Sequence, residues 1–406
     1  MINIIGLGYI GLPTALILAA NGVSVTGTDY DRELVDTLNS GMTTFEEDGL
    51  DKLFIKANEN GVLFTTEYIS TDIYIVAVPT PYDKASKKID ANYVISAVNR
   101  ILEVCFDGAI IVIESTISPG TIDKHVRPLI QAFGLETGKD IHLVHAPERI
   151  IPGNMIHELK FNSRTIGADT KSIGERVKQI YSSFCDAEII ITDIRTAEMT
   201  KVVENTFRDI NIAFANELTK ICRTDKMDVY EIIRIANMHP RVNILQPGPG
   251  VGGHCISVDP WFLVGDYPDL TNLILAARKI NDSMPKHVLG RIRDIMREHN
   301  IKDISKVGLY GLTYKEDVED TRESPTLQLL ENMAEHLAYG IKVFDPMVKS
   351  RVVDHQFMNF EDFLNEIEVL VIMVSHTHIK ENMDLIEGKL ILDTKNICSF
   401  NKSYKL

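Results

Sequence analysis

The sequence has few cysteines, and no two of them are spaced like metal ligands. The number of cysteines is odd, their spacing is wide, and no C-x-x-C pair occurs. We therefore expect neither a disulfide framework nor a metal site, but reduced thiols in a cytoplasmic protein. The five cysteines are Cys105, Cys185, Cys222, Cys255 and Cys398.

Positive charge and long apolar runs are also scarce. The 406 residues include 42 Lys and Arg against 57 Asp and Glu, for a formal net charge of -15. Such an acidic chain is not expected to bind nucleic acid or a membrane surface, so a phosphate-bearing ligand needs local basic side chains and backbone N–H groups. No apolar run reaches the roughly 18 residues of a membrane span. Residues 1–6 run directly into a strand without a basic segment, so no signal peptide is expected.

What the sequence does contain is short apolar strands that alternate with helical segments at both ends of the chain. In the first part, this alternation predicts a parallel, doubly wound sheet domain over residues 1–190. Its expected strands are residues 2–5, 23–28, 73–78, 109–114 and 141–145, with a helix at residues 14–21.

The middle of the chain, residues 191–295, is predicted to be a helical connecting domain, because helical periodicity dominates it. The α/β alternation then returns and predicts a second, smaller sheet domain over residues 296–406. The expected helices are residues 195–223, 227–238, 273–298 with a break near Pro285, and 325–339; the expected strands are residues 306–310, 342–344, 369–374 and 390–393. The predicted fold class is α/β, with two Rossmann-like doubly wound domains joined by a helical middle domain.

A G-x-G-x-x-G turn, formed by Gly6, Gly8 and Gly11, lies between the first strand and the first helix. In this context the three glycines permit a tight turn, close approach of a pyrophosphate, and close packing of the helix on the strand. The second strand ends at Asp29, where a carboxylate can bind ribose hydroxyls and would repel a 2′-phosphate. The pattern favours NAD over NADP; the alternative is a sheet domain that binds another nucleotide or none.

Two threonines follow later strands of the same expected sheet. Thr80 and Thr116 come directly after the strands at 73–78 and 109–114. Ligands of open α/β sheets bind at the carboxyl ends of the strands, so both threonines are candidate cofactor contacts. The alternative is that they are ordinary turn or helix-capping residues.

Cys255 stands in a glycine-rich loop, Gly252-Gly253-His254-Cys255, four residues before Asp259. Glycines at this position would leave space for a substrate to reach the sulfur, and an accessible thiolate is a nucleophile. The alternative is a small buried residue, the usual environment of a free cysteine. His254 is not expected to be the catalytic partner, because partners of a nucleophile usually come from elsewhere in the fold.

Polar residues form one face of the long helix expected at 195–223. Glu198, Lys201, Asn205 and Arg208 fall at helical spacing on that face. The residues alone favour a solvated surface, since exposed charge is the default; the alternative is a pocket wall that presents an ammonium, an amide and a guanidinium. The apolar residues around them, which we expect to be buried, are Val202, Val203, Phe207, Ile210, Ile212 and Phe214.

Several segments together resemble the UDP-glucose/GDP-mannose dehydrogenase family, in the right order and over essentially the whole chain. They are Gly6–Pro13, His145–Gly153, Lys201 with Asn205, Gly252–Cys255 with Asp259, and Thr313–Pro325. Segments 146–149, 204–217 and 239–255 are most similar to the branch that acts on UDP-N-acetyl-D-mannosamine. The chain departs from the UDP-glucose branch at 256–258, where Ile-Ser-Val replaces Phe-Pro-Lys, and at Pro152, where a second Glu is common.

The resemblance implies a four-electron oxidation of the sugar C6 alcohol, giving UDP-N-acetyl-D-mannosaminuronic acid and using two NAD per turnover. It implies that Cys255 attacks the intermediate aldehyde to form a thiohemiacetal, which is oxidised to a thioester and hydrolysed. Lys201 would exchange protons and stabilise the oxyanion, assisted by Asn205 and Asp259. Glu148 would position water.

The resemblance also implies the binding residues and the assembly. The cofactor contacts are Gly6, Gly8, Tyr9, Ile10, Gly11, Asp29, Thr80, Thr116 and Arg322. The contacts to the UDP-sugar are Arg149, Ile150, Lys201, Asn205, Arg208, His239, Arg241, Gly252 and Lys315. Residues 296–406 would hold most of the UDP, and the middle domain would form a homodimer or larger homo-oligomer in which Arg241 reaches a neighbouring subunit's site.

Three alternatives stay open. The same reaction could use UDP-N-acetylglucosamine or UDP-glucose. A simple two-electron dehydrogenase predicts that Cys255→Ser leaves turnover intact. A non-catalytic nucleotide-sugar sensor is disfavoured, because a sensor need not retain Lys201, Asn205, Cys255 and Asp259 together.

Overall fold

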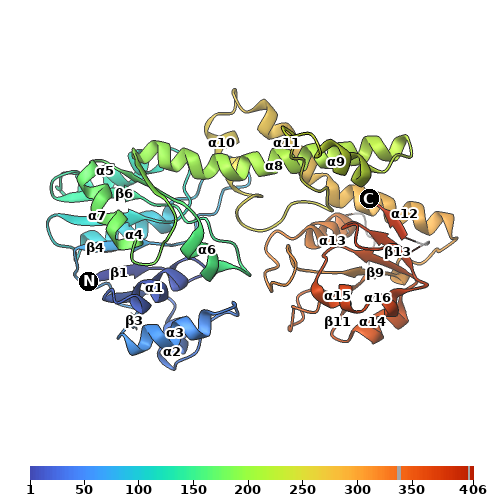
Figure 1. Ribbon diagram of the computed structural model, residues 1–406, viewed down its shortest axis with the longest axis horizontal. Coiled ribbons are helices and arrows are strands. Elements are labelled where there is room, and N and C mark those ends of the chain that lie inside the picture. The colour runs from blue at the N-terminus through green and yellow to red at the C-terminus, as the bar shows by residue number, and fades with distance from the viewer. Residues whose placement is uncertain (336–339, 401–402) are drawn as a thin grey trace. The chain divides into compact units, whose positions relative to one another are not determined.

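The structure is a computed structural model, which describes residues 1–335, 340–400 and 403–406. The chain divides into two compact units, residues 1–204 and residues 205–406, and each is described by itself. The division falls within one long helix, α8 (Ile194–Thr224). Figure 1 gives the elements of both units, coloured along the chain.

The first unit is built on an eight-stranded sheet in the order β3-β2-β1-β4-β5-β6-β7-β8. Neighbouring strands are parallel except β6 and β7, which are antiparallel. Strand β1 is bonded to β2 on one side and to β4 on the other, so the chain reverses its direction of winding there. Such a reversal leaves a crevice at the carboxyl ends of the two central strands, where α/β proteins bind ligands. The strands are β1 (Ile2–Ile5), β2 (Val25–Thr28), β3 (Leu63–Thr65), β4 (Ile73–Val76), β5 (Ala109–Ile113), β6 (Ile141–His145), β7 (Arg164–Ala168) and β8 (Ile189–Thr192).

Helices cover both faces of this sheet because the central strands β1, β4 and β5 are apolar except for Asn3, so both of their faces must be buried. Ile4 belongs to the core on one face, with residues of α1, while Ile5 and Tyr74 belong to the core on the other face, with residues of α4. The helices are α1 (Gly11–Ala20), α2 (Arg32–Asn39), α3 (Leu50–Glu59), α4 (Asn92–Leu102), α5 (Arg127–Ala132), α6 (Met155–Phe161) and α7 (Lys171–Tyr181), with a π-helical turn at Ile122–Val126.

The second unit contains a six-stranded, fully parallel sheet in the order β11-β10-β9-β12-β13-β14. Its winding also reverses, between β9 and β12. The strands are β9 (Val307–Tyr310), β10 (Lys342–Phe344), β11 (Gln356–Phe357), β12 (Val369–Ile372), β13 (Leu390–Asp393) and β14 (Ser403–Lys405). The helices are α9 (Val229–Ala236), α10 (Asp259–Asp266), α11 (Asn272–Asp282), α12 (Met284–Glu298), α13 (Pro325–Glu335), α14 (Phe360–Glu366), α15 (Thr377–Glu381) and α16 (Met383–Ile386), with a 3-10 turn at Ile304–Lys306.

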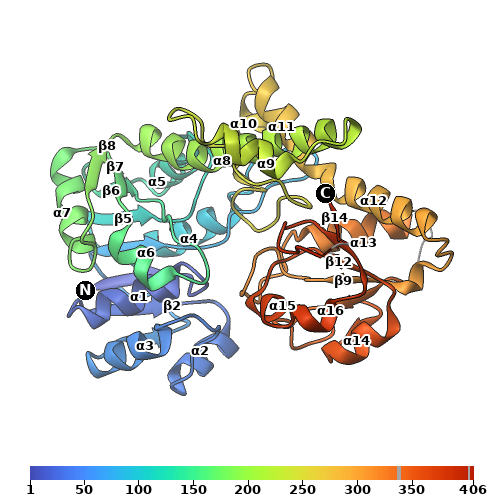
Figure 2. The same cartoon turned by 45° about the vertical axis from the view of Figure 1, so that its right-hand side comes forward.

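Successive residues of a strand point to opposite faces of the sheet, so the side chains of this sheet also fall into two layers. Val307 and Leu309 pack with α12 and α13, whereas Tyr310, the next residue, packs with the helices of the other face. Figures 1 and 2 show α14, α15 and α16 on one side of this sheet and α13 on the other. The two Rossmann-like sheets and the intervening helices confirm the predicted fold class.

The expected elements agree with the observed ones most closely where the apolar runs are sharply bounded. Four strands have the predicted bounds: β1, β6, β10 and β13. Helix α8 matches the expected helix to within one residue at each end, and the expected break near Pro285 is the start of α12. The expected helix 325–339 is present as α13 to Glu335, and residues 336–339 lie outside the described residues. Strands β7 and β8 were not expected, and they extend the first sheet beyond β6.

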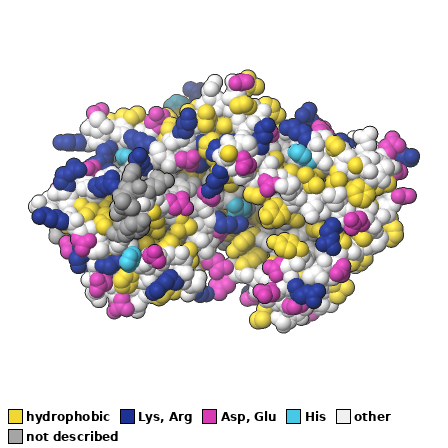
Figure 3. Space-filling model, turned by 180° about the vertical axis from the view of Figure 1, so that it is seen from behind, with side chains coloured by type: hydrophobic (Ala, Val, Ile, Leu, Met, Phe, Trp, Pro, Cys, Tyr) yellow, Lys and Arg dark blue, Asp and Glu magenta, His cyan; other side chains and the backbone are white. Residues whose placement is uncertain are grey.

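The surface and the helices show how the charges and apolar residues are distributed. On the face shown in Figure 3, Lys and Arg side chains are scattered among Asp and Glu side chains. Among the described residues, no helix is both long enough and apolar enough to cross a membrane.

Candidate functional site

The glycine turn after β1 has two glycines that the fold requires and one that it does not. Gly6 has a φ of 90°, and a Cβ there would lie 2.6 Å from the carbonyl oxygen of Ala77. A Cβ at Gly11 would collide with the carbonyl oxygen of Gly6. At Gly8, by contrast, a Cβ would meet no protein atom within 4 Å. Gly8 therefore leaves open space beside the backbone, as close approach of a pyrophosphate requires.

Asp29 lies next to this turn at the end of β2. Its carboxylate accepts a hydrogen bond from the backbone N–H of Leu7 at 2.8 Å and one from that of Asp31 at 3.0 Å. Helix α1 begins at Gly11 without a side-chain cap, and the dipole at its N-terminus favours an anion beside the turn. A carboxylate beside an open glycine turn and an uncapped helix fits the ribose and pyrophosphate of NAD.

The other expected cofactor contacts of this unit lie around the same edge of the sheet. Tyr9 is half-buried and packs on Phe45, with ring centroids 4.4 Å apart. The hydroxyl of Thr80 donates to the carbonyl oxygen of Thr116 at 2.6 Å, which joins the loops that follow β4 and β5. The Thr80 hydroxyl thus has a turn-stabilising role, and contacts from these residues to a cofactor stay predictions.

Glu148, in the loop after β6, belongs to a buried cluster of charges. The guanidinium of Arg164 pairs with Glu148 and lies 3.6 Å from Glu114, so one cation serves two carboxylates. It also stacks on the ring of Tyr181 at 4.5 Å, while the Tyr181 hydroxyl donates to Glu114 at 2.9 Å. Burial, and then the charge of Glu148, raise the pKa of Glu114 to about 7. This cluster has no signature in the sequence, because its members come from four separate segments: the loops after β5 and β6, strand β7 and helix α7.

Arg149 and Ile150, the expected substrate contacts beside Glu148, are also held by the first unit. The Arg149 guanidinium pairs with Glu204 at 2.6 Å and donates to the hydroxyl of Thr165 at 3.0 Å. Ile150 is buried in the sheet core. The structure brings Glu148, Arg149 and Ile150 together in one loop.

Glu198 opens the polar face of α8 and is fully buried, not solvated. Its carboxylate accepts from the backbone N–H of Gly120 at 2.5 Å and from that of Ile122 at 3.1 Å. Burial raises the pKa of Glu198 to about 7, although these two N–H groups act in the opposite direction. Glu198 thus attaches the segment after Thr116 to α8.

The expectation of a solvated polar face was wrong for three of its four residues. Glu198, Lys201 and Asn205 are buried, whereas Arg208 is exposed. The expected burial of the apolar residues was wrong for Val203, Phe207 and Phe214, which are 47%, 64% and 49% exposed. Periodicity defines the faces of a helix, but it does not say which face other elements cover.

Asn205 and the Cys255 loop are joined in the second unit. The Asn205 amide donates to the carboxylate of Asp259 at 2.6 Å, within buried surroundings. The backbone N–H groups of Val258 and Asp259 donate to the carbonyl oxygen of Cys255 at 3.0 and 2.9 Å. Cys255 itself is half-buried. The loop therefore places the thiol one turn before Asp259, which begins α10.

The glycines of this loop are required for close packing within the protein, a role that the sequence alone did not indicate. A Cβ at Gly252 would lie 2.6 Å from the carbonyl oxygen of Glu323 and 2.8 Å from Tyr314. Gly253 has a φ of 82°, and a Cβ there would lie 2.8 Å from the Tyr314 ring. Its N–H donates to the carbonyl oxygen of Arg322 at 3.0 Å. The Cys255 loop thus packs on residues 314–325, the segment that contains Lys315 and Arg322.

Charged side chains also hold the Cys255 loop on the segment 314–325. Asp320 pairs with Arg322 at 2.5 Å and lies 4.0 Å from Nδ1 of His254. Burial would raise the pKa of Asp320, but the hydrogen bonds and charge of Arg322 lower it overall. His254 therefore contributes to holding the loop, as a structural group beside Cys255.

The loop that carries His239 and Arg241 is anchored by three asparagine side chains that the sequence analysis missed. Asn237 exchanges two hydrogen bonds with the backbone of Ile244, at 2.7 and 2.9 Å. Asn211 accepts from the N–H of Leu245, and Asn216 accepts from that of Gly248, both at 2.9 Å. His239 and Arg241 themselves are exposed. Asparagine is unfavourable inside helices, so Asn211 and Asn216 within α8 were the available signal.

No group of three His, Cys, Asp or Glu side chains in the part of the chain that the structure describes could hold a metal ion. The polar groups at the Cys255 loop of the second unit include the Cys255 thiol, the buried Asn205 amide and the buried Asp259 carboxylate. Such a set suits covalent and proton-transfer chemistry on an organic substrate.

Three family models match successive parts of the chain. They are the NAD binding domain, the central domain and the UDP binding domain of the UDP-glucose/GDP-mannose dehydrogenase family, at residues 1–185, 195–283 and 308–400. The chain belongs to this family, and its cofactor is NAD.

Particular relatives are similar over nearly the whole chain. A UDP-N-acetyl-D-mannosamine dehydrogenase of Methanococcus aeolicus is 42% identical, covering 98% of this chain and 92% of the relative. An NDP-N-acetyl-D-galactosaminuronic acid dehydrogenase of Ralstonia nicotianae is 39% identical, covering 98% and 96%. The solved structure of a UDP-N-acetyl-mannosamine dehydrogenase from S. aureus is 40% identical and superposes with a TM-score of 0.89, covering 100% of this chain and 97% of that one.

Replacing Gly8 by Ala tests the cofactor turn. The new methyl group meets no protein atom, so the protein should fold as before, but it occupies space beside the turn and should weaken NAD binding about tenfold or more. Calorimetric titration with NAD measures this. The matched control is Gly290→Ala, on α12, where a Cβ also meets nothing within 4 Å and NAD affinity should not change. Equal NAD affinities for the two variants would contradict the assignment.

Replacing Glu198 by Gln tests the buried carboxyl. Its pKa in the folded protein, about 7, lies above the ordinary 4.5, so its contribution to stability is complete below about pH 4.5 and is lost as the pH rises through 7. Between these pH values, the wild-type protein should lose more free energy of unfolding than the variant, by at most about 3 kcal/mol. Urea unfolding at several pH values measures the difference.

The control for this experiment is Glu175→Gln, an exposed carboxyl on α7. Its stability should follow that of the wild type at every pH. Parallel pH profiles for wild type and Glu198→Gln would show that Glu198 is not protonated preferentially in the folded protein.

Proposed function

We propose that the protein oxidises the C6 alcohol of UDP-N-acetyl-D-mannosamine to the carboxylate of UDP-N-acetyl-D-mannosaminuronic acid, with Cys255 as the covalent nucleophile. The observation that carries the proposal is the 2.6 Å hydrogen bond between Asn205 and Asp259, which joins the polar face of α8 to the Cys255 loop. A half-buried thiol in a loop whose backbone is bonded to Asp259, itself bonded to a buried amide, is an arrangement suited to covalent catalysis.

Bound NAD supplies the hydride acceptor, and the complete oxidation of the alcohol uses two NAD. In the proposed reaction, the sulfur of Cys255 forms a bond to the C6 carbon of the aldehyde, giving a thiohemiacetal. Loss of a hydride from that carbon and of a proton from its oxygen gives a thioester, and water then releases the acid and the thiol. The covalent bond keeps the aldehyde from escaping and makes the second oxidation effectively intramolecular.

Lys201 and Asn205 are four residues apart on α8, so they share one face of the helix. In the proposal, the Lys201 ammonium exchanges the proton of the C6 oxygen, and the Asn205 amide supports the oxyanion. Asp259 fixes the Asn205 amide by accepting its N–H. Glu148, whose charge is held by Arg164, positions the water that hydrolyses the thioester.

Contacts to the rest of the substrate follow the family resemblance. They are assigned to Arg149, Ile150, Arg208, His239, Arg241, Gly252 and Lys315, and Arg322 is assigned to NAD. The sugar is inferred from the UDP-N-acetyl-D-mannosamine dehydrogenases among the relatives and from residues 256–258, which differ from the UDP-glucose branch. The relative named for N-acetyl-galactosaminuronic acid makes another N-acetylated hexosamine the second candidate.

Cys255→Ser tests the mechanism. Loss of the nucleophilic sulfur should lower formation of the acid by roughly a thousandfold or more, because the second oxidation depends on the covalent adduct. The wild-type protein should release two NADH for each molecule of acid formed from UDP-N-acetyl-D-mannosamine, measured by absorbance together with product mass. The matched control is Cys105→Ser, which alters another half-buried thiol and should keep wild-type turnover.

A panel of UDP-sugars separates the alternatives in the same assay. The other substrates are UDP-N-acetylglucosamine, UDP-N-acetylgalactosamine and UDP-glucose. Unchanged turnover of Cys255→Ser would indicate a simple two-electron dehydrogenase. Binding of UDP-sugars without NADH release would indicate a sensor, and preference for another sugar would contradict the proposed substrate.

We also propose that the protein forms a homodimer or larger homo-oligomer through α8. Phe207, Phe214 and Ile221 are 64%, 49% and 51% exposed and recur every seven residues, so they form one apolar stripe on the helix. Large exposed apolar patches mark association sites, and a stripe with a seven-residue repeat is suited to packing against an equivalent helix of a second copy.

Replacing Phe207 and Phe214 together by Glu tests this interface. Two buried carboxylates on each side should abolish association at micromolar concentration, as measured by sedimentation or by light scattering after gel filtration. The control is Leu385→Glu on α16, another exposed apolar residue, 47% exposed, which should keep the wild-type mass. A wild-type protein that is monomeric, or a double variant of unchanged mass, would rule out the stripe as the interface.

A further inference from the structure

The turn after β9 repeats the backbone geometry of the glycine turn after β1. In the first unit, Gly6 N–H donates to the carbonyl oxygen of Thr28, and Leu7 N–H donates to the carboxylate of Asp29, both at 2.8 Å. In the second unit, Gly311 N–H donates to the carbonyl oxygen of Phe344 at 2.8 Å. Leu312 N–H donates to the carboxylate of Asp345 at 2.5 Å. Asp345 thus stands where a ribose-binding carboxylate stands in a dinucleotide-binding sheet.

The carboxylate of Asp345, however, has its acceptor positions filled from within the protein. It also accepts from the N–H groups of Thr313 at 3.0 Å and Met347 at 2.8 Å, and it lies 3.3 Å from Nε2 of His376. Its side chain is completely buried. Burial would raise the pKa of Asp345, but the hydrogen bonds that it accepts from His376 and from these N–H groups lower it overall. Asp345 is therefore an anionic anchor for the surrounding chain.

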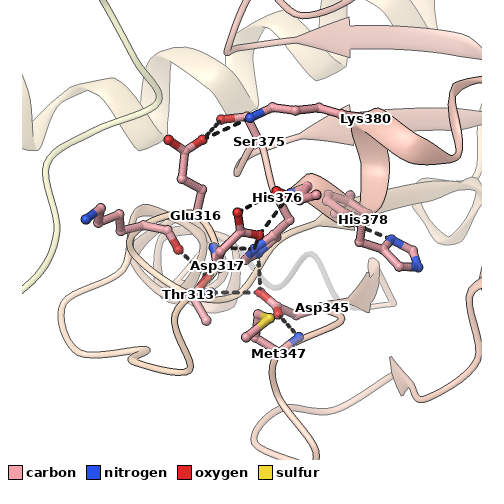
Figure 4. Close-up of polar contacts among 12 residues, drawn as sticks. Thr313, Glu316, Asp317, Asp345, Met347, Ser375, His376, His378 and Lys380 are labelled. Carbon is pink, nitrogen blue, oxygen red and sulfur yellow. Dashed lines mark hydrogen bonds and ion pairs between the residues drawn. The ribbon is translucent and has the colours of Figure 1, made fainter. Parts of the chain in front are cut away.

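His376 connects this anchor to the turn that carries Lys315. Its Nδ1 accepts from the backbone N–H of Asp317 at 2.9 Å, so the ring proton is on Nε2. Nε2–H then faces the hydroxyl oxygen of Thr313 at 3.2 Å and the carboxylate of Asp345. The ring is fully buried, and Figure 4 shows it between Asp317 and Asp345. Each ring nitrogen thus has a distinct partner.

Residues 313–317, which we call the lysine turn, are held by further hydrogen bonds. The Thr313 hydroxyl donates to the carbonyl oxygen of Lys315 at 2.9 Å. The Asp317 carboxylate accepts from the N–H and hydroxyl of Thr377 at 2.9 and 2.7 Å. Glu316 accepts from the hydroxyl of Ser375 at 2.7 Å (Figure 4). The turn is thereby held on both sides of Lys315 by the segment that follows β12.

Asp317 also has a backbone conformation that needs such support. Its φ is 56°, in the left-handed region, which Asp tolerates better than most residues. A residue held in this region costs free energy that the surrounding contacts must offset, and such positions cluster where a side chain must be aimed. Hydrogen bonds on both sides of Asp317 supply this compensation.

We infer that His376, Asp317 and Thr313 are positioning residues that hold the lysine turn so that the ammonium of Lys315 meets the diphosphate of the nucleotide sugar. The inference rests on the proposed function, in which Lys315 contacts the substrate. A lysine on a flexible turn loses side-chain and backbone entropy when it binds a phosphate, and a preformed turn has already lost the backbone part. The positioning residues therefore act on affinity for the UDP portion and not on the hydride transfer or on NAD.

The test measures the affinity of the full-length protein for UDP, by calorimetry, in five variants. His376→Ala removes both ring contacts, and Asp317→Ala removes the cap and disfavours the positive φ. We expect each to weaken UDP binding about tenfold, with the KM for the UDP-sugar raised to match and with kcat and NAD affinity kept within about twofold. Asp317→Asn keeps a left-handed residue with a capping oxygen and should restore UDP affinity to within about twofold. Lys315→Ala is the reference for complete loss of the ammonium contact.

The matched control is His378→Ala. His378 lies two residues from His376 and contacts the Tyr310 hydroxyl at 3.1 Å, on the opposite side from the lysine turn, so UDP affinity should not change. Thermal unfolding of each variant shows whether it is folded. If His376→Ala does not fold, Asp317→Ala still tests the inference, because Asp317 is partly exposed.

The outcomes separate this inference from the proposed function. If Lys315→Ala weakens UDP binding while His376→Ala and Asp317→Ala bind UDP as the wild type does, the positioning role is wrong and the proposed function stands. If Lys315→Ala binds UDP normally, the lysine turn does not contact the nucleotide and the inference is wrong. Absence of NADH release with every UDP-sugar, despite wild-type UDP binding, would instead contradict the proposed function.

Discussion

The hydrogen bond between Asn205 and Asp259 is the contact on which the candidate active site depends. It joins a helix side chain to the first residue of α10, and the backbone of Asp259 is in turn bonded to the carbonyl oxygen of Cys255. Because both partners are buried, loss of either one would leave an unsatisfied polar group, which is costly. The position of the thiol is therefore coupled to α8 through a short chain of hydrogen bonds.

The Cys255 loop has a second support, formed by a segment about sixty residues further along the chain. Gly253 bonds to the backbone of Arg322, and Gly252 and Gly253 pack closely on Tyr314. Asp320 holds Arg322 and lies beside His254. Two motifs that resemble the same family, the cysteine loop and the Asp-Thr-Arg-Glu-Ser-Pro run, are thus parts of one packed structure. This contact explains why positions 252 and 253 require glycine.

Buried charges support the other residues of the proposed chemistry. Arg164 lies between Glu114 and Glu148, and Arg278, on α11, pairs with the buried Asp209 of α8 at 2.6 Å. Buried pairs of this kind contribute little to net stability because of their desolvation, but removal of one partner is strongly destabilising. Their value lies in holding helices and loops in one arrangement. Asp29 and Asp345 occupy equivalent positions in the two Rossmann-like sheets. The Asp345 carboxylate, however, is engaged in internal contacts, one of them with His376.

The sequence by itself determined the repeating elements and the motifs with local causes. Strands with sharp apolar boundaries, the break at Pro285 and the glycine turn at Gly6–Gly11 follow from backbone conformation and short-range periodicity, which are encoded within a few residues. Only the tertiary structure decided which faces of α8 are covered, why Gly252 and Gly253 are glycines, and which partners hold Glu148 and Lys315. Those answers depend on contacts between residues tens of positions apart, and burial or pairing at such distances has no signature in the local order of the residues.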